Sequence, residues 1–173
     1  MWMKNIFLVY DKCCFYEITI LSYFMNFTGQ EIVFCSLDGK AIRCMEGYSV
    51  NVDMALKDSK INEIRCLIIP GGDIFNINNK EVHNIIRELV KKDVIVSAIC
   101  AGVDVLDDAG VLKGINSTHS EDADVSSDKN IITARANAYV DFAIEVAKSL
   151  DLFEDEKDLQ ETIDFWKYHK KIQ

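Results

Sequence analysis

The amino-acid sequence predicts a three-layer α/β/α sandwich with a mostly parallel central sheet. Short apolar runs alternate along the chain with segments whose apolar residues recur at helical spacing, which is typical of βαβ units. The runs are apolar throughout, as expected for strands that helices cover on both faces. The chain has 173 residues, one Pro and eight Gly. We therefore expect a single domain over 1–173 with no linker.

Continuous apolar runs, rich in β-branched residues, predict the strands. In chain order these strands cover 5–10, 31–37, 64–69, 94–99 and 131–134. A turn signal at Asp38-Gly39 indicates a short extended excursion or hairpin over 41–50.

Apolar residues at helical spacing and glycine stop signals predict the helices. In chain order these helices cover 15–27, 79–92, 102–109, 139–150 and 159–169. The first is expected to end at Gly29 and the third at Gly110, while 79–92 carries an apolar stripe. The acidic run 151–158 is expected to be a solvated connection before the C-terminal helix.

Composition excludes several classes of function. A net charge of −9 argues against nucleic-acid binding, because phosphates require clustered Lys and Arg. The apolar run at 6–10 is too short for a signal peptide or a membrane span, so we expect a cytosolic protein with no membrane partner. Six cysteines without a Cys-x-x-Cys pair, and only three His, indicate reduced thiols and no metal site. We expect no cofactor.

The segment from Val94 to Gly102 is the most informative part of the chain. A buried strand ends in Ala-Ile-Cys-Ala-Gly and helix-compatible residues follow, which is the layout of a nucleophile elbow with a thiol as its reactive group. A thiol at the start of a helix lies near the positive end of the helix dipole, which favours the thiolate. Cys100 is therefore the candidate nucleophile.

Five further positions are candidates for the same site, since ligands of such sheets bind beyond the carboxyl ends of the strands. Gly71 and Gly72 follow a strand and can expose backbone N–H groups, together with that of Ala101, as an oxyanion hole; a tight turn is the alternative. Glu17 is either a protonated carboxyl in apolar surroundings or a surface residue at a helix start. His119 is either a base for Cys100 or a loop residue.

Cys13 and Cys14 form a vicinal pair near the start of the first predicted helix. The sequence allows a redox role for this pair, although plain packing is the favoured interpretation. Cys35 and Cys66 lie inside strand-like runs and are expected to fill the core.

These motifs, in this order, resemble the ThiJ/PfpI superfamily, and in particular its deglycase-like branch associated with parkinsonism. The resemblance covers roughly residues 3–152. It rests on Glu17, Ile68-Ile69-Pro70-Gly71-Gly72, Ser97-Ala98-Ile99-Cys100-Ala101-Gly102, Gly110-Val111-Leu112-Lys113-Gly114, Ser117-Thr118-His119 and Asn130-Ile131-Ile132-Thr133-Ala134-Arg135.

The resemblance implies a flavodoxin-like sandwich, usually a homodimer, that acts on a small-molecule substrate. It implies that Cys100 is the nucleophile or oxidisable thiol, that a protonated Glu17 bonds to it, and that His119 lies nearby. Ala101 stands where the protease-like branch has His, so peptidase activity is not expected. An isocyanide hydratase-like enzyme is a further alternative. That branch of the superfamily has Asp where Glu17 stands, which weakens this assignment.

Three hypotheses follow for the function. The first is an enzyme that uses Cys100 on a small electrophile, as in glyoxalase- or deglycase-like hydration or hydrolysis. The second is a redox-responsive or chaperone-like protein in which Cys100 is oxidised to a sulfinate capped by Glu17. The third is a non-catalytic regulatory domain that retains the elbow.

Overall fold

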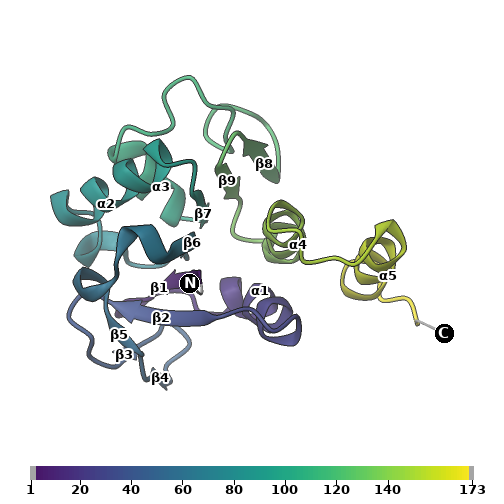
Figure 1. The fold of residues 1–173 in the computed structure, drawn as a ribbon, viewed down its shortest axis with the longest axis horizontal. Helices are drawn as coiled ribbons and strands as arrows, with labels where there is room; N and C mark the ends of the chain where they lie inside the picture. Colours follow the sequence, from purple (N-terminus) through teal and green to yellow (C-terminus); the bar gives the residue numbers. More distant parts are fainter. Residues whose placement is uncertain (1–2, 172–173) are drawn as a thin grey trace.

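The computed structural model describes residues 3–171, and its central feature is a seven-stranded sheet seen nearly edge-on in Figure 1. The sheet contains β1 (Lys4–Leu8), β2 (Ile32–Ser36), β5 (Met54–Ala55), β6 (Ile64–Ile69), β7 (Ile95–Ile99), β8 (Val125–Asp128) and β9 (Ile131–Ala134). The strand order is β5-β2-β1-β6-β7-β9-β8. Every neighbouring pair is parallel except β8 with β9, so the expected mostly parallel sheet is confirmed.

Helices cover both faces of this sheet, which gives the predicted α/β/α sandwich. They are α1 (Tyr16–Phe27), α2 (Lys80–Lys91), α3 (Gly102–Asp108), α4 (Tyr139–Ser149) and α5 (Glu156–Trp166). The pair α1 and α4 packs on one face and the pair α2 and α3 on the other, with α5 outside α4 (Figure 1). Short 3₁₀ turns occur at Leu56–Asp58, Ile61–Glu63 and Ile74–Asn76.

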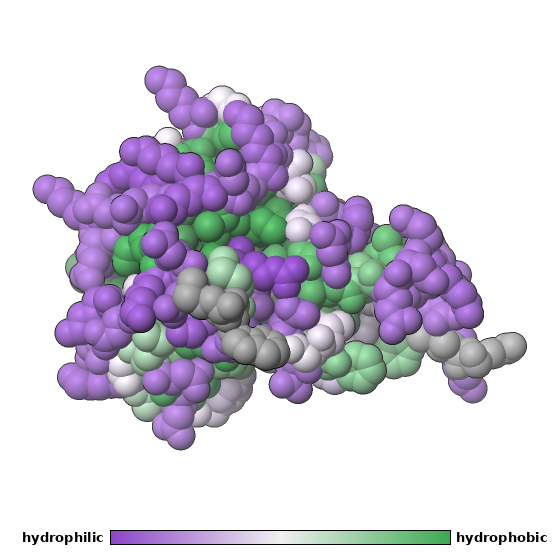
Figure 2. Space-filling model, in the orientation of Figure 1, coloured by the Kyte–Doolittle hydropathy of each residue, from purple (hydrophilic) through white to green (hydrophobic). Residues whose placement is uncertain are grey.

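The core forms where these layers meet, because the central strands carry apolar side chains toward both helical faces. Phe7, Ile68 and Ile99 are fully buried, as is Phe142 of α4. On the other face, α2 buries the apolar stripe of Val82, Ile86 and Leu89. Figure 2 shows mainly hydrophilic residues over the outer sides of α2 and α5, and hydrophobic residues between the layers.

The predicted excursion over 41–50 is a separate antiparallel ribbon of two strands. Its strands are β3 (Ile42–Arg43) and β4 (Ser49–Val50). The ribbon bonds to the loop after β1, since the Lys12 N–H donates to the Arg43 carbonyl at 2.7 Å.

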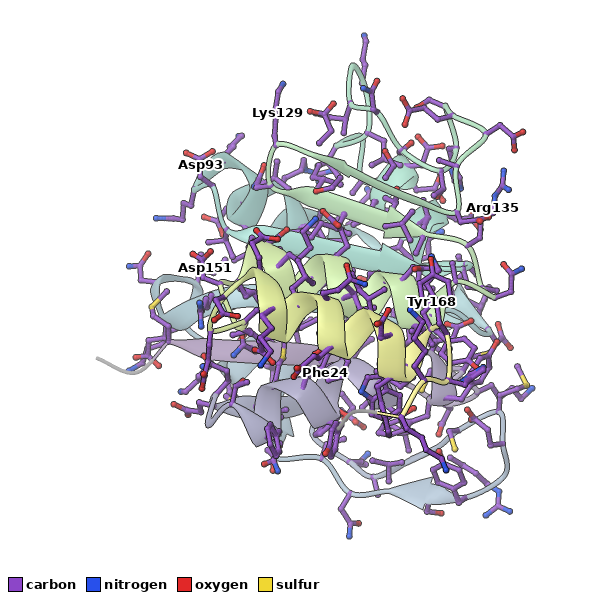
Figure 3. All side chains as sticks on the ribbon, turned by 90° about the vertical axis from the view of Figure 1, so that its right-hand side faces the viewer. Phe24, Asp93, Lys129, Arg135, Asp151 and Tyr168 are labelled. Carbon is purple, nitrogen blue, oxygen red and sulfur yellow. The ribbon has the colours of Figure 1, made fainter. Side chains whose placement is uncertain are left out.

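The C-terminal helix begins earlier than the sequence indicates. Helix α5 starts at Glu156 rather than near 159, because the Asp155 side chain accepts the N–H of Asp158 at 2.9 Å and caps the first turn. The last residues of the acidic run are therefore helical. Their carboxylates lie at the N-terminus of α5, where the helix dipole stabilises negative charge. Figure 3 shows α5 lying across α4, near Phe24 of α1, whose ring centroid is 5.7 Å from that of Trp166.

No helix within residues 3–171 is long and apolar enough to cross a membrane. The carboxyl ends of the parallel strands all face one edge of the sheet. The loops after β1, β6, β7 and β9 therefore meet there, as the sequence predicts for the candidate site residues.

Candidate active site at the carboxyl edge of the sheet

Cys100 occupies a sharp turn between β7 and α3. Its backbone is left-handed, with φ at 57°, a conformation that residues with a side chain rarely adopt. Two backbone hydrogen bonds fix this turn: the Cys100 N–H donates to the Ala134 carbonyl at 2.9 Å, and the Cys100 carbonyl accepts the Val103 N–H at 3.1 Å. The predicted strand-to-helix turn is therefore present, and its backbone is strained at the thiol.

Two glycines allow the turns after β6 and β7 to lie against each other. A Cβ on Gly71 would lie 2.6 Å from the Cys100 Sγ, and a Cβ on Gly102 would lie 2.5 Å from the Ile69 carbonyl oxygen. Both distances are shorter than any non-bonded carbon contact. A side chain at either position would therefore displace the thiol or the turn.

Glu17 lies in the first turn of α1 and points inward, with only 1% of its surface exposed. Its Oε2 accepts the Gly71 N–H at 2.7 Å. Its Oε1 is buried and has no hydrogen-bond partner among the described residues. Burial raises the pKa of Glu17 above its ordinary value, against the opposing effects of the Gly71 N–H and the Cys100 side chain. Of the two interpretations of Glu17 from the sequence, the buried carboxyl is therefore correct.

The Cys100 thiol and the Glu17 carboxyl influence each other. Burial raises the pKa of Cys100, the Glu17 carboxylate raises it further, and the N–H groups of Ala101 and Gly72 lower it. The position at the start of α3 does not by itself produce a low thiol pKa, contrary to the expectation from the sequence, because burial outweighs it. Two negative charges in this site oppose each other, so the state in which both groups are ionised is disfavoured.

The predicted oxyanion hole needs a correction at Gly71. Its N–H is occupied by Glu17, so it positions the carboxyl instead of facing a substrate oxygen. Gly72 and Ala101 are the two residues whose N–H groups face the Cys100 sulfur. Gly72 has φ at 117°, which only glycine adopts readily, and a Cβ there would lie 2.7 Å from the Cys13 Cα.

His119 does not face Cys100. Its Nε2 lies 3.2 Å from Asp104 Oδ1, and its Nδ1 lies 3.2 Å from Asp107 Oδ2. These carboxylates lie one turn apart on α3, so the histidine ties its loop to that helix. Both ring nitrogens are occupied, and the structure places no base beside the thiol from this position. The sequence feature that could have indicated this pairing is the spacing of Asp104 and Asp107, which are three residues apart on a predicted helix.

Tyr10 was not identified from the sequence, although it holds the Pro70-Gly71-Gly72 turn in place. Its buried hydroxyl lies 2.7 Å from the Pro70 carbonyl and 2.8 Å from the Gly71 carbonyl. Burial raises the pKa of Tyr10 far above its ordinary value, so the hydroxyl keeps its proton as a donor to these carbonyls. The sequence feature that could have identified Tyr10 is its position at the end of the first predicted strand, at the same edge of the sheet as Gly71.

Cys14 is a second thiol at this edge that sequence reasoning did not join to the site. Its N–H donates to the Gly71 carbonyl at 2.9 Å, and its carbonyl accepts the Glu17 N–H at 3.3 Å. Burial, then the charges of Glu17 and Cys100, raise the pKa of Cys14 to about 11. Cys13 is buried instead, while Cys35 and Cys66 fill the core as predicted. All six cysteines are free thiols.

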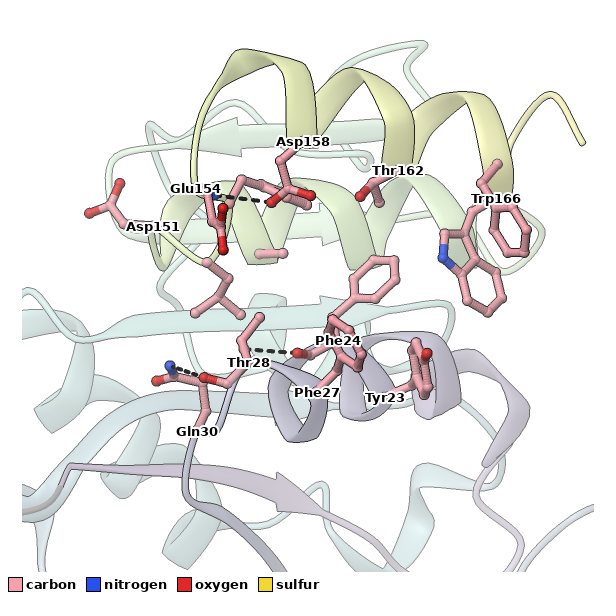
Figure 4. A pocket seen from close by; sticks show the side chains of 14 residues that line it. Tyr23, Phe24, Phe27, Thr28, Gln30, Asp151, Glu154, Asp158, Thr162 and Trp166 are labelled. Atoms are coloured by element: carbon pink, nitrogen blue, oxygen red, sulfur yellow. Dashed lines mark hydrogen bonds between the residues drawn. The ribbon is translucent and has the colours of Figure 1, made fainter. Parts of the chain in front are cut away.

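A separate cavity of about 600 Å³ lies between α1 and α5, away from Cys100 (Figure 4). Aromatic side chains of α1 line one side, and Thr162 and Trp166 of α5 line the other. None of the candidate site residues lines it. Within residues 3–171, no three His, Cys, Asp or Glu side chains are grouped so that they could hold a metal ion.

Comparison with known proteins identifies the relatives of this chain. The sequence model of the DJ-1/PfpI family matches residues 3–149. The protein named Deglycase PfpI, from Pyrococcus furiosus, is 31% identical over 119 residues, which are 67% of this chain and 71% of that protein. A protein named as a deglycase in Thermococcus kodakarensis is 36% identical over 93 residues. That match covers 52% of this chain and only 55% of the relative, about half its length.

Solved structures show the same fold. A DJ-1 superfamily protein from Agrobacterium tumefaciens superimposes with a TM-score of 0.86 at 24% sequence identity, over 97% of this chain and 100% of that one. At this level of identity the likeness supports the flavodoxin-like sandwich and nothing about the reaction.

Proposed function

Since the chain belongs to the DJ-1/PfpI family, we propose that it is a cysteine-dependent enzyme acting on a small electrophilic carbonyl. The substrate class is a 2-oxoaldehyde, or the adduct that such an aldehyde forms with an amino group. The names of the two archaeal relatives support the second of these, because both are called deglycases.

One observation carries the proposal. Glu17 is buried, bound through Oε2 to the Gly71 N–H, and has an unpartnered Oε1 in the site that also holds the Cys100 thiol. A carboxyl with a raised pKa beside a thiol can accept the thiol proton and return it, which is what attack on a carbonyl requires.

The first step follows from this arrangement. The Cys100 sulfur attacks the aldehyde carbon, an S–C bond forms, and the C=O electron pair moves to the oxygen. We expect the N–H groups of Gly72 and Ala101, which act on the Cys100 thiol, to bind that oxygen as its charge develops. Glu17 transfers the thiol proton to the oxygen, which gives a hemithioacetal.

Glu17 can then move a second proton. It takes the hydrogen, as a proton, from the carbon bonded to sulfur and returns it to the neighbouring carbon, while the hydroxyl proton moves to the oxygen of that neighbouring carbon. A 2-oxoaldehyde hemithioacetal thereby becomes a thioester. Water hydrolyses the thioester, releasing a 2-hydroxy acid and restoring the Cys100 thiol. No step needs an oxidant, since the net change is the addition of one water molecule.

Consumption of methylglyoxal tests the proposal. Cys100→Ser should abolish turnover, and Glu17→Gln should lower it by about 10²–10⁴-fold, because the amide cannot accept the thiol proton. Glu154→Gln, at an exposed carboxylate before α5, is the control and should retain turnover. Turnover that survives in Cys100→Ser would overturn the proposal. A wild-type protein without turnover, whose Cys100 is oxidised by mild peroxide, would favour the redox hypothesis instead.

A further inference from the structure

We propose that Cys14 is a resolving thiol for Cys100, so that a hydroperoxide converts the two residues into a reversible disulfide. The inference rests on the proposed function in one respect, the reactivity of Cys100. Beyond that function, Cys100 gains Cys14 as a redox partner and a hydroperoxide as its oxidant.

The two cysteines contact the same pair of glycines. The Cys100 Sγ lies against Gly71, where a Cβ would come within 2.6 Å of it. The Cys14 N–H donates to the carbonyl of that same Gly71 at 2.9 Å, and a Cβ on Gly72 would lie 2.9 Å from the Cys14 nitrogen. No other residue separates the backbone of Cys14 from this glycine turn.

Glu17 connects the two thiols from the other side. It lies three residues after Cys14 and donates its N–H to the Cys14 carbonyl at 3.3 Å, while its carboxyl shares the site with Cys100. The electrostatic coupling agrees with this geometry, because the charges of Glu17 and Cys100 both raise the pKa of Cys14.

Access and backbone freedom also favour Cys14 over the other cysteines. Cys14 and Cys100 are the two half-exposed cysteines, whereas Cys13, Cys35, Cys44 and Cys66 are buried. Cys14 lies before the start of α1, so its side chain can rotate toward Cys100 without unwinding the helix. Both residues are partly open to a dissolved hydroperoxide.

The chemistry balances in two steps. The Cys100 thiol gives up its proton and its sulfur attacks a peroxide oxygen, so that the O–O bond breaks and the sulfenic acid of Cys100 forms. With hydrogen peroxide, the departing hydroxide takes up that proton and leaves as water. The Cys14 sulfur then attacks the Cys100 sulfur, the S–O bond breaks, and the departing hydroxide takes the Cys14 proton to leave as a second water. Two thiols lose two electrons in total, and the peroxide gains them. A small dithiol reverses the change.

Formation of this disulfide has a consequence for Cys100. A sulfenic acid that is captured by a neighbouring thiol does not proceed to the irreversible sulfinic and sulfonic acids. Cys14 would thus turn oxidation of the nucleophile into a temporary loss of activity.

The test is mass spectrometry of the whole protein after treatment with a several-fold molar excess of hydrogen peroxide, because formation of a sulfinic acid consumes two molecules of the oxidant. Wild type should lose about 2 Da, and dithiothreitol should restore the original mass. A tryptic digest prepared without reductant should contain peptide 13–40 joined by a disulfide to peptide 93–113. Cys14→Ser should give no link and should instead gain about 32 Da on Cys100, several-fold faster than wild type.

Cys13→Ala is the matched control, since it removes the adjacent buried thiol from the same tryptic peptide and should leave the link intact. Wild type that gains about 32 Da on Cys100 at the same rate as Cys14→Ser, with no linked peptide, overturns the inference while Cys100 reactivity stands. A Cys100 that reacts with neither peroxide nor iodoacetamide overturns the inference together with the proposed function. The wild-type measurements decide the matter even if a variant fails to fold.

Discussion

Oε2 of Glu17 accepts the backbone N–H of Gly71 at 2.7 Å, which joins the first turn of α1 to the turn after β6. This bond fixes one oxygen of a buried carboxyl and leaves Oε1 without a partner among the described residues. Burying a carboxyl in this way costs stability when the group is ionised. The site therefore holds a carboxyl beside Cys100 at a cost in folding stability.

We predict that Glu17→Gln stabilises the protein at neutral pH and not at acid pH. The folded-state pKa of Glu17 is raised by burial. Below the ordinary pKa of a glutamic acid, wild type and variant are both neutral at this position and equally stable. As the pH rises through the raised folded-state pKa, wild type loses the stability associated with its bound proton, whereas the amide loses nothing.

Thermal unfolding from pH 4 to pH 8 measures this difference. The melting temperature of Glu17→Gln minus that of wild type should grow with pH, by about 2–4 °C for each kcal/mol gained. Glu154→Gln, at an exposed position, should show no such trend. A difference that shrinks with pH would mean that Glu17 is stabilised as a carboxylate.

Gly71→Ala should disable Cys100 without removing it. The new Cβ would lie 2.5 Å from the Cys100 Cβ and 2.6 Å from its Sγ, so the thiol must move. We expect the rate of Cys100 alkylation by iodoacetamide to change at least about tenfold, and unfolding to become easier by about 1–3 kcal/mol. Gly29→Ala is the control: its φ of 72° makes a side chain strain the backbone, but nothing lies within 4 Å of its Cβ. Equal effects of the two variants on the alkylation rate would show that general destabilisation, not the contact with the thiol, is responsible.

The sequence predicts the buried strands well and the polar edge poorly. The bounds of β6 and β9 agree with those predicted, because their apolar runs reflect burial on both faces. The edge strand β8 was missed, since Val125-Ser126-Ser127-Asp128 has no apolar pattern and becomes a strand only by pairing with β9.

The same limit applies to the site. Cys100 could be identified from local sequence, because a strand, a small-residue turn and a helix are consecutive in the chain. The bond between Glu17 and Gly71 spans 54 positions, and the contact of Cys14 with Gly71 is of similar range. Such pairings depend on the order of strands in the sheet, which no local pattern specifies. The pairing of His119 with α3 is of shorter range and had a local signal, the spacing of Asp104 and Asp107 on that helix.

Because the backbone at Cys100 is left-handed, we predict that Cys100→Gly is more stable than Cys100→Ala, the reverse of the usual order for these two residues. At φ 57°, Cys100→Ala keeps a Cβ in a conformation that L-residues avoid, and Cys100→Gly removes it. Glycine should therefore be the more stable of the two by about 1 kcal/mol. Cys66, in the extended strand β6, provides the comparison: there Cys66→Gly should be less stable than Cys66→Ala. Chemical denaturation of the four variants measures both differences, and the same order at both positions would rule out strain at the elbow.

Replacement of His119 should leave the reactivity of Cys100 unchanged. Both ring nitrogens of His119 face carboxylates of α3 at 3.2 Å, so the ring takes no part in moving the thiol proton. We expect His119→Ala to change the alkylation rate of Cys100 and the turnover of methylglyoxal by less than about twofold, against the 10²–10⁴-fold loss of an essential base.

The stability cost of His119→Ala should also be small, because these ion pairs are largely exposed and contribute at most about 1 kcal/mol. Asp104→Asn and Asp107→Asn, which remove the partners one at a time, should behave like the histidine variant in both assays. If His119→Ala lowered turnover more than tenfold while the two asparagine variants did not, the histidine would have to leave α3 and reach Cys100 during the reaction. In the resting structure the buried carboxyl that shares the site with Cys100 is that of Glu17.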